Sequence, residues 1–377
     1  MNNKLPIYLN NAATSFPKPN ILGKEIAEHI SEIPRHPGRI GSADMVNKLQ
    51  LCRKAIARLI NINNPNQIVL CKNATEGLNI VIHGLKLQKS DTVITSSLEH
   101  NSVLRPLFLI RKTKKFKLVI LPCNTEGRII KEDWQRVLDQ YKPKVVIMNH
   151  ASNVTGAVND ISFLFKQAKQ KHCITVLDTS QTLGLIDVDV NNLFADIIVF
   201  TGHKYLLGPT GTGGVYINKN IDIQPVFVGG TGIKSDLLEM PPEMPVKLEP
   251  GTPNIALFAG LIKTINWQKE NPVNLEKFLS LTNRLSEKLS ENGMNTIKVK
   301  GERTGIVSFF SKKWSVDEIG YILNKNYNII CRTGLHCAPL IHKYLKTYPK
   351  GTVRFSLSRF TTEEEINLVV EAMKAFQ

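Results

Sequence analysis

The sequence predicts an α/β fold in which a large domain with a mostly parallel sheet is followed by a smaller α+β domain. Three observations predict it. Short runs rich in Val and Ile alternate with amphipathic stretches from about residue 20 to about residue 250, as in parallel sheets buried on both faces. The proline-rich stretch "PPEMPVKLEPGTPN" (241–254) ends this alternation. After it, two helices precede a mixture of strands and helices.

Six apolar runs are the predicted strands of the large domain, because strands buried on both faces are short and apolar. They are residues 67–73, 91–97, 116–123, 144–150, 173–180 and 195–202. Helices are predicted from Thr75 to Leu85 and near Ser102 to Lys112. A further strand, "GVYI" (214–217), follows the glycine-rich run "GPTGTGG" (208–214).

The second part of the chain has its own pattern of elements. Two predicted helices cover residues 256–270 and 275–293, and Gly293 caps the second. Beyond them we expect strands at 296–300, 305–310, 328–333 and 351–358, a helix near 315–325, and a last helix over 362–376. Thr361 or Thr362 is the expected N-cap of that last helix. We therefore expect a large domain over residues 20–253 and a small domain formed by residues 1–19 and 254–377.

The basic composition does not by itself predict nucleic-acid binding. The formal net charge is +16, from 48 Lys and Arg against 32 Asp and Glu. These residues are dispersed, and we interpret the densest cluster, "RKTKKFK" (111–117), as a solvated helix end leading into a strand. No nucleic-acid-binding motif accompanies it. We expect no nucleic acid among the partners.

Apolar runs and cysteines indicate the compartment. No run reaches the roughly 18 apolar residues that span a bilayer, and the N-terminus has no signal-peptide pattern. The six cysteines are widely spaced in a long chain, so we expect free thiols rather than disulfides. These observations predict a cytoplasmic protein without a membrane partner.

Polar residues stand where the predicted strands end. Because the carboxyl ends of parallel strands meet at one edge of a sheet, we expect these side chains to lie around one ligand. Thr75, Thr201 and His203 offer an anion site, and Asp178 offers a carboxylate for a buried cation. His100 offers a flat ring partner, Asn153 and Gln181 offer amides, and Lys204 offers an amine. Pyridoxal 5′-phosphate (PLP) has a matching phosphate, pyridine nitrogen, ring, phenolic oxygen and aldehyde, and is the expected cofactor.

Two other kinds of site are disfavoured by spacing. The run at 208–214 lacks the Gly-Lys-Ser/Thr ending of a nucleoside-triphosphate loop and precedes a strand instead of a helix. We interpret its glycines as allowing close approach of the backbone to the cofactor. Cys331, His336, Cys337 and His342 are not at a standard zinc spacing, so no metal is expected.

With these residues in view, the sequence resembles the class V aminotransferase-fold enzymes, which are PLP-dependent transferases of fold type I. Within them it is most similar to the cysteine desulfurases of the Suf-type branch (group II). The resemblance covers nearly the whole chain and rests on "YLNNAATSFPKP", "NATEGLN", "LEHNS", "NHASNVTGAV", "DTSQTLG", "TGHKYLLGPTGTG", "EPGTPN", "RTGLHCAP" and "VRFSLSRFTTEEEI".

The resemblance implies a role for each matching position. Catalysis would rest on Lys204, which would bind the cofactor covalently, on His100 stacked on its ring, and on the sulfur acceptor Cys337. Substrate would be bound by Arg354 through its carboxylate, with Arg332 and Asn153 nearby. The cofactor would be held by Ala74, Thr75, His100, Asn153, Asp178, Gln181, Thr201, His203, Lys204, and Thr252 from the other subunit of a homodimer.

The implied reaction is conversion of L-cysteine to L-alanine, with the sulfur left on Cys337 as a persulfide. The sulfur would pass to an acceptor protein, as in iron–sulfur cluster assembly. Selenocysteine lyase, another class V β-lyase and an aminotransferase stay open as alternatives. The stretch "RHPGRIGSAD" (35–44) resembles an active-site loop, bearing Arg39, of a subgroup whose substrate is uncertain, so the preferred substrate is also open.

Overall fold

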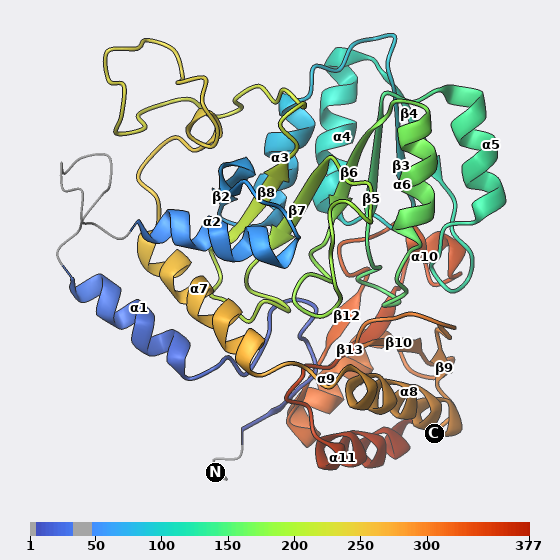
Figure 1. Cartoon of the computed structure of the whole chain (residues 1–377). Helices are drawn as coiled ribbons and strands as arrows, with labels where there is room; N and C mark the ends of the chain where they lie inside the picture. The colour runs from blue at the N-terminus through green and yellow to red at the C-terminus, as the bar shows by residue number, and fades with distance from the viewer. Residues whose placement is uncertain (1–4, 33–46) are drawn as a thin grey trace.

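A seven-stranded sheet forms the centre of the larger part of the molecule (Figure 1). The computed structural model describes residues 5–32 and 47–377, so the stretch with Arg39 lies outside the described residues. The strand order is β2 (Ile68–Cys71), β8 (Gly213–Ile217), β7 (Ile197–Thr201), β6 (Ile174–Asp178), β5 (Val145–Asn149), β3 (Thr92–Ser96) and β4 (Lys117–Leu121).

The sheet is mostly parallel, as predicted. From β7 to β4 every neighbouring pair runs parallel, and only β8 runs antiparallel to both β2 and β7. Strands β2, β3, β5 and β7 are fully buried, and β6 is buried apart from its first residue, which explains their mostly apolar sequences, whereas the edge strand β4 is partly exposed. The order reverses between β3 and β5, because β4 lies on one side of β3 and the later strands lie on the other.

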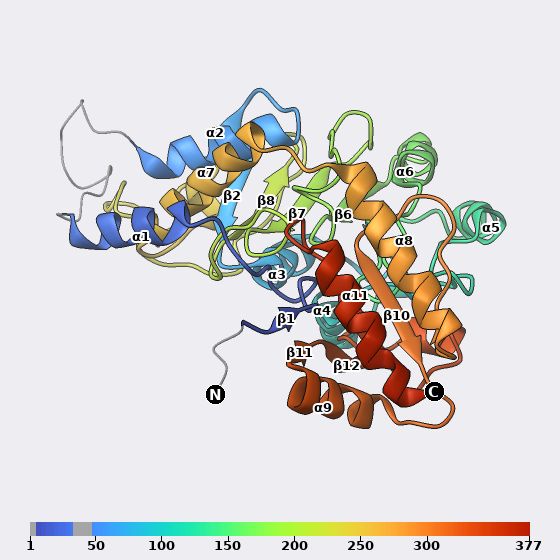
Figure 2. The ribbon, with the colours of Figure 1, turned by 90° about the horizontal axis from the view of Figure 1, so that it is seen from below.

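Helices cover both faces of this sheet (Figure 2). One core joins the sheet to four helices: α2 (Lys48–Leu59), α5 (Lys131–Tyr141), α6 (Ile161–Gln170) and α7 (Ile255–Glu270). The other face packs against α3 (Ala74–Gly84) and α4 (Asn101–Lys114). The remaining helix of this part, α1 (Ile21–Ser31), lies along α7. The interpreted helix end is confirmed, since α4 stops at Lys114 just before β4.

A four-stranded antiparallel sheet organises the C-terminal part. Its order is β12 (Arg332–Gly334), β13 (Thr352–Ser356), β10 (Ile306–Phe310) and β9 (Asn295–Thr296). Its core includes α8 (Leu275–Glu291), α9 (Val316–Tyr327) and α11 (Glu363–Met373). Thr362 is the N-cap of α11 and forms a capping box with Glu365. A short helix, α10 (Ile341–Tyr344), stands beside the sheet.

The N-terminal segment joins the two parts. Strand β1 (Ile7–Tyr8) pairs in parallel with β11 (Ile329–Ile330), and Asn10 forms a bridge with Ser356 of β13. We propose from the two sets of packed side chains that the chain has a larger and a smaller domain. Since α7 packs in the core of the larger sheet, the C-terminal contribution to the smaller core begins with α8, and Leu9 of the N-terminal segment packs in that core as well.

One predicted strand is much shorter than expected. Residues 296–300 were expected to be extended, but only Asn295 and Thr296 pair with β10. The Arg128 guanidinium takes the carbonyl oxygens of Lys300 and Glu302 at 2.7 and 2.5 Å, which draws this segment away from the sheet. None of the helices in residues 5–32 and 47–377 has the length and apolar composition needed to cross a membrane.

Gly213 provides a test of how closely β8 packs. A Cβ atom there would lie 2.8 Å from Cα of Asn73 and 2.9 Å from the carbonyl oxygen of Phe200. Gly213→Ala should therefore lower the free energy of unfolding by about 1–3 kcal/mol, because backbone atoms must move. Gly23→Ala is the control. Gly23 lies in α1 with open space around it, so this substitution should raise the free energy of unfolding by about 0.5–1 kcal/mol. Denaturant titration of both variants measures the free energy of unfolding. An equal change in the two variants would contradict the close packing inferred at Gly213.

Candidate active site

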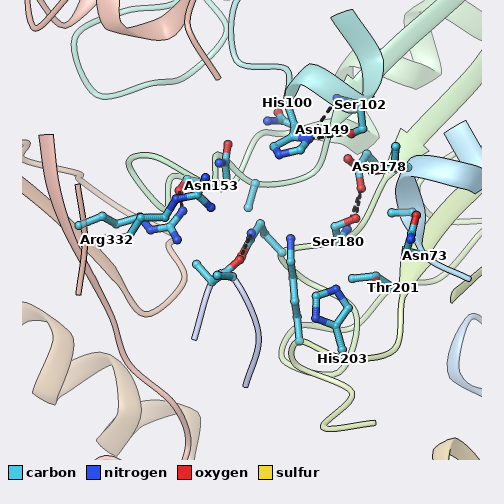
Figure 3. Close-up of a pocket in the computed structure, with 18 residues that line it drawn as sticks. Asn73, His100, Ser102, Asn149, Asn153, Asp178, Ser180, Thr201, His203 and Arg332 are labelled. Carbon is cyan, nitrogen blue, oxygen red and sulfur yellow. Dashed lines mark hydrogen bonds between the residues drawn. The ribbon is translucent and has the colours of Figure 1, made fainter. Parts of the chain in front are cut away.

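A cavity of about 290 Å³ opens at the carboxyl ends of the parallel strands (Figure 3). Strands β5, β6 and β7 end at it, and α3 and α4 begin at it. It lies beside the reversal in strand order between β3 and β5, where open α/β sheets bind ligands. Its lining includes Ala12, Ala13, Asn73, Ala74, Thr75, His100, Ser102, Asn149, Ala151, Asn153, Asp178, Ser180, Gln181, Thr201, His203, Lys204, Arg332 and Arg354.

Lys204 projects its amine into this cavity from the turn after β7. The pKa of the amine is lowered to about 8, mainly by burial; Asp178 opposes this shift, and the nearby Arg354 and Arg332 add to it. The turn itself is fixed by hydrogen bonds from Leu207 N to the Lys204 carbonyl and from Gly208 N to the Gly202 carbonyl. More of this amine is thus neutral, and nucleophilic, near neutral pH than for an ordinary exposed lysine.

Asp178 ends β6 on the far side of the cavity from Arg332 (Figure 3). Its Oδ1 accepts hydrogen bonds from the backbone N–H and the hydroxyl of Ser180. These bonds fix the carboxylate and leave Oδ2 for a ligand. Gln181 donates through Nε2 to the Ala12 carbonyl at 3.0 Å, while its buried Oε1 has no partner among the described residues.

The N-terminus of α3 forms one wall of the cavity. Asn73 caps this helix by accepting from Glu76 N, so the N–H groups of the first turn, at Ala74 and Thr75, stay available to a ligand. Thr201 and His203 line the same cavity. Burial lowers the pKa of His203 to about 4, with Lys204 and Lys18 adding to the effect, so the ring is neutral. An anion is the expected ligand of such a helix start.

His100 is the N-cap of α4. Its Nδ1 accepts from Ser102 N at 3.1 Å and lies 2.8 Å from the Ser102 hydroxyl, so Nε2 carries the proton. The pKa of His100 is lowered to about 4, mainly by burial, with the charges of Lys204, Arg332 and Arg354 adding to the effect. The ring is therefore neutral and held by its cap bond, which suits it to stack on a flat ligand.

Arg354, in the middle of β13, is almost completely buried. Its guanidinium donates to two neutral oxygens, the Asn153 carbonyl at 2.8 Å and Asn10 Oδ1 at 3.2 Å, and its Nε has no partner among the described residues. The pKa of Arg354 is lowered to about 9, mainly by burial, with the charge of Arg332 adding to the effect. A buried guanidinium surrounded by neutral oxygens favours an incoming carboxylate.

Cys337 is held next to the cavity by its backbone and its sulfur. Its carbonyl accepts from Asn101 N at 2.7 Å, and the carbonyl of His336 accepts from Asn153 Nδ2 at 2.7 Å. Arg332 donates from Nη2 to the Cys337 sulfur at 2.9 Å. His336 and Cys337 both have left-handed backbones, with φ of 50° and 59°. Such angles are costly for side-chain-bearing residues and persist where the surroundings impose them.

Sequence reasoning did not find every contact of this site. It predicted that Asn153 contacts the ligand. In the structure, the side-chain amide of Asn153 also donates a hydrogen bond to the loop that carries Cys337. His336, the sequence neighbour of Cys337, turns away and bonds Thr352 Oγ1 through Nε2 at 2.9 Å. Asn10, Asn73 and Ser102 were missed as supporting residues; their signal was their place beside polar strand ends and helix starts.

Thr252 lies apart from the cavity. It is exposed and lines a separate groove of about 1050 Å³ on the surface. That groove also reaches Asn73, the cap of the helix that begins at the cavity. Within one chain, the other predicted cofactor and substrate residues line the cavity, whereas Thr252 does not.

Known proteins resemble this chain over nearly its whole length. The family model described as "Aminotransferase class-V" matches residues 7–369. A "Probable cysteine desulfurase" of Methanothermobacter thermautotrophicus is 30% identical over 98% of this chain and 94% of that protein. Another, of Pyrococcus abyssi, is 32% identical over 96% and 91%. The apo structure of a cysteine desulfurase from Thermococcus onnurineus NA1 superposes with a TM-score of 0.87 at 28% identity, covering 98% of this chain and 94% of the other.

The thiols should differ sharply in reactivity. Burial raises the pKa of Cys52 and Cys331 to about 12, of Cys173 to about 11, and also raises the pKa of Cys71 and Cys123. Cys337 instead accepts a bond from a guanidinium. Iodoacetamide at neutral pH should therefore alkylate Cys337 first, and Arg332→Gln should slow that labelling about tenfold, because a charge-assisted bond to the thiolate is lost.

Peptide mapping by mass spectrometry measures this labelling. Arg359→Gln is the control, since Arg359 is a partly exposed arginine that bonds the Asn271 carbonyl and stacks on Trp267. Equal labelling rates in all three proteins would show that Arg332 does not act on the sulfur.

Proposed function

The chain belongs to the aminotransferase class-V family and is a cysteine desulfurase, and from that premise we propose that it converts L-cysteine to L-alanine with PLP as cofactor and Cys337 as sulfur acceptor. The observation that carries the proposal is the bond between the Arg332 guanidinium and the Cys337 sulfur, made by an arginine that also lines the Lys204 cavity. The amine of Lys204, which can lose its proton near neutral pH, and the thiol of Cys337 thus belong to the same site.

The polar atoms of the cavity fit PLP. Four buried side-chain atoms that line it have no partner among the described residues: Asn153 Oδ1, Gln181 Oε1, His203 Nδ1 and Arg354 Nε. Leaving such atoms without a partner is costly, so a polar ligand is expected. PLP, when bound, supplies an electron-accepting ring that stabilises negative charge at the substrate Cα.

Each part of PLP has matching residues in this chain. The N–H groups of Ala74 and Thr75, with Thr201 and His203, would hold its phosphate. Asp178 would pair with the pyridine nitrogen and keep it protonated. The remaining contacts would be His100 on the ring, Gln181 and Asn153 at the phenolic oxygen, and Lys204 at the aldehyde.

Arg354 and Lys204 divide the work on the amino acid. Arg354 binds the α-carboxylate through its planar guanidinium, with Arg332 and Asn153 beside it. This orients Cα toward the amine of Lys204. Because the pKa of that amine is lowered to about 8, it can both accept and return a proton near neutral pH, and it moves the Cα proton.

Cys337 takes the sulfur. Its thiolate forms an S–S bond to the substrate sulfur while the substrate Cβ–S bond breaks, and the electron pair of that bond stays on the carbon. Proton uptake at carbon then gives alanine, and Cys337 is left as a persulfide. Arg332 stabilises the thiolate before attack. Since Cys337 is partly exposed, its persulfide is accessible to a sulfur-acceptor protein.

A homodimer would complete the phosphate site. Thr252 is exposed and outside the cavity of its own chain, in the same segment as the exposed apolar residues Phe227, Val228 and Leu238. Apolar side chains gathered in one segment favour burial against a partner. A second copy of the chain, seated there, would cover this segment and bring Thr252 to the neighbouring cavity.

The sulfur step can be tested with two substrates. Cys337→Ala should release alanine from L-cysteine at a rate lower by at least about 100-fold, because no thiolate takes the sulfur. It should retain activity on L-selenocysteine, since a selenol is expelled with less help. Cys331→Ala is the matched control and should keep both reactions, because Cys331 is a thiol whose pKa burial raises to about 12.

Alanine formation from each substrate is the measurement, with the yellow colour of bound cofactor recorded alongside. Lys204→Ala should lose both reactions. Undiminished alanine release from L-cysteine in Cys337→Ala would refute the sulfur-acceptor role. Loss of both reactions together with the colour would make Cys337 a structural residue.

The dimer can be tested through its exposed apolar segment. Leu238→Asp should shift sedimentation from dimer toward monomer, because burying a carboxylate in an interface is unfavourable. Activity should fall in parallel, as Thr252 of the partner is lost. Leu368→Asp, at an equally apolar exposed position on α11, should leave the dimer intact. A fully active monomer would remove the dimer from the proposal.

A further inference from the structure

Glu99 is a buried acid for which the reaction described above has no use. It lies between β3 and α4, has no exposed surface, and directly precedes His100. Its Oε1 accepts from the Ser96 hydroxyl at 2.6 Å and from Asn149 N at 3.1 Å. Its Oε2 is buried and has no partner among the described residues.

These bonds cross a gap in the sheet. Strands β3 and β5 pair only at Val93–Val145 and Ile94–Val146, and they separate toward their carboxyl ends. Beyond this point, side-chain hydrogen bonds connect the two strand ends in place of backbone pairing. Thr95 Oγ1 donates to the Ile147 carbonyl at 3.0 Å, and Asn149 Nδ2 donates to the Leu98 carbonyl at 2.9 Å. Glu99 adds the link between Ser96 and Asn149.

The strand ends linked in this way lead directly to residues of the active site. The end of β3 continues through Glu99 into His100, the cap of α4, and α4 gives its first N–H to the Cys337 carbonyl. The end of β5 continues toward Asn153, whose side chain bonds the His336 carbonyl. A shift between the two strand ends would therefore move His100 relative to Asn153 and the Cys337 loop.

We propose that Glu99 is a positioning residue of the active site, whose carboxyl group ties the separated ends of β3 and β5 and so fixes His100 against the cavity. The proposal rests on the proposed function only for the role of His100. Glu99 does not line the cavity and touches no reacting atom.

The surroundings favour a neutral carboxyl group. Only Oε1 receives donors, so an ionised group would leave charge on a buried oxygen without a partner. The pKa of Glu99 is raised to about 8, mainly by burial; the bonds from Ser96 and Asn149 oppose this rise, and the charge of Asp178 adds to it. The adjacent histidines, His100 and His150, have pKa values lowered to about 4 by burial and supply no positive charge.

Three variants of the holoenzyme test this. Glu99→Gln keeps a carbonyl oxygen for both donors and mimics a neutral acid. Glu99→Ala removes the tie. Glu132→Gln, on exposed α5 surface, is the matched control. At neutral pH, Glu99→Ala should lower kcat at least tenfold, roughly the loss expected from a displaced catalytic group, whereas Glu99→Gln should stay within about threefold of the unsubstituted protein.

The second measurement is the thermal midpoint as a function of pH. A carboxyl whose pKa is raised on folding contributes stability that is present at low pH and lost as pH rises toward about 8. Glu99→Gln does not titrate. Its midpoint should therefore gain on that of the unsubstituted protein by at least about 2 °C between about pH 5 and about pH 8, whereas Glu132→Gln should stay parallel.

Each result decides the proposal. A Glu99→Ala variant with undiminished kcat, or a Glu99→Gln variant as impaired as Glu99→Ala, overturns the positioning role. A midpoint difference for Glu99→Gln that does not change with pH overturns the neutral carboxyl, and this arm stands even if Glu99→Ala does not fold. Failure of the proposed function is distinguishable, because the unsubstituted protein itself would then release no alanine from L-cysteine.

Discussion

Parallel pairing of β3, β5, β6 and β7 is the constraint on which the rest of this molecule depends. Because these strands run the same way and are buried, the polar residues at their carboxyl ends meet at one edge of the sheet. Asp178, Asn153 and Lys204 are each fixed at that edge by a different strand. The sheet supplies a rigid frame from which short turns carry Asn153 and Lys204 to the cavity.

The second sheet contributes charge to this frame. Arg332 and Arg354 face each other in register on β12 and β13 and bring positive charge to a cavity whose fixed carboxylate, Asp178, lies on the opposite side. Burial lowers the pKa of Lys204 and of Arg354, and the charges of the neighbouring arginines add to this effect. The cavity is thus prepared for anionic groups and for an amine that exchanges protons near neutral pH, two properties that a desulfurase with PLP would use.

The sequence predicts the parallel strands and the cavity lining better than it predicts the hydrogen bonds that join the two parts of the molecule at the site. Continuous Val and Ile runs predict buried parallel strands, and the polar residue after each run predicts the cavity lining, because both follow from local pattern and sheet geometry. The bonds from Arg332 to the Cys337 sulfur and from Asn153 to the His336 carbonyl depend on how β12 and α10 pack against the first sheet. No periodicity encodes them. Likewise, the left-handed backbone at His336 and Cys337 is imposed by distant contacts, since neither residue favours it.

The N-terminal segment contributes to the cavity through contacts between residues that are far apart in the sequence. Asn10 bonds Arg354 across 344 positions of sequence, and the N–H of Ala12 bonds Ser356 across a similar span. Contacts this distant form late, because the ordering entropy of closing so long a loop must be met first. A nascent chain consequently cannot form these bonds until Arg354 and Ser356 have been synthesised, so the cavity is completed only once β13 packs beside the N-terminal segment.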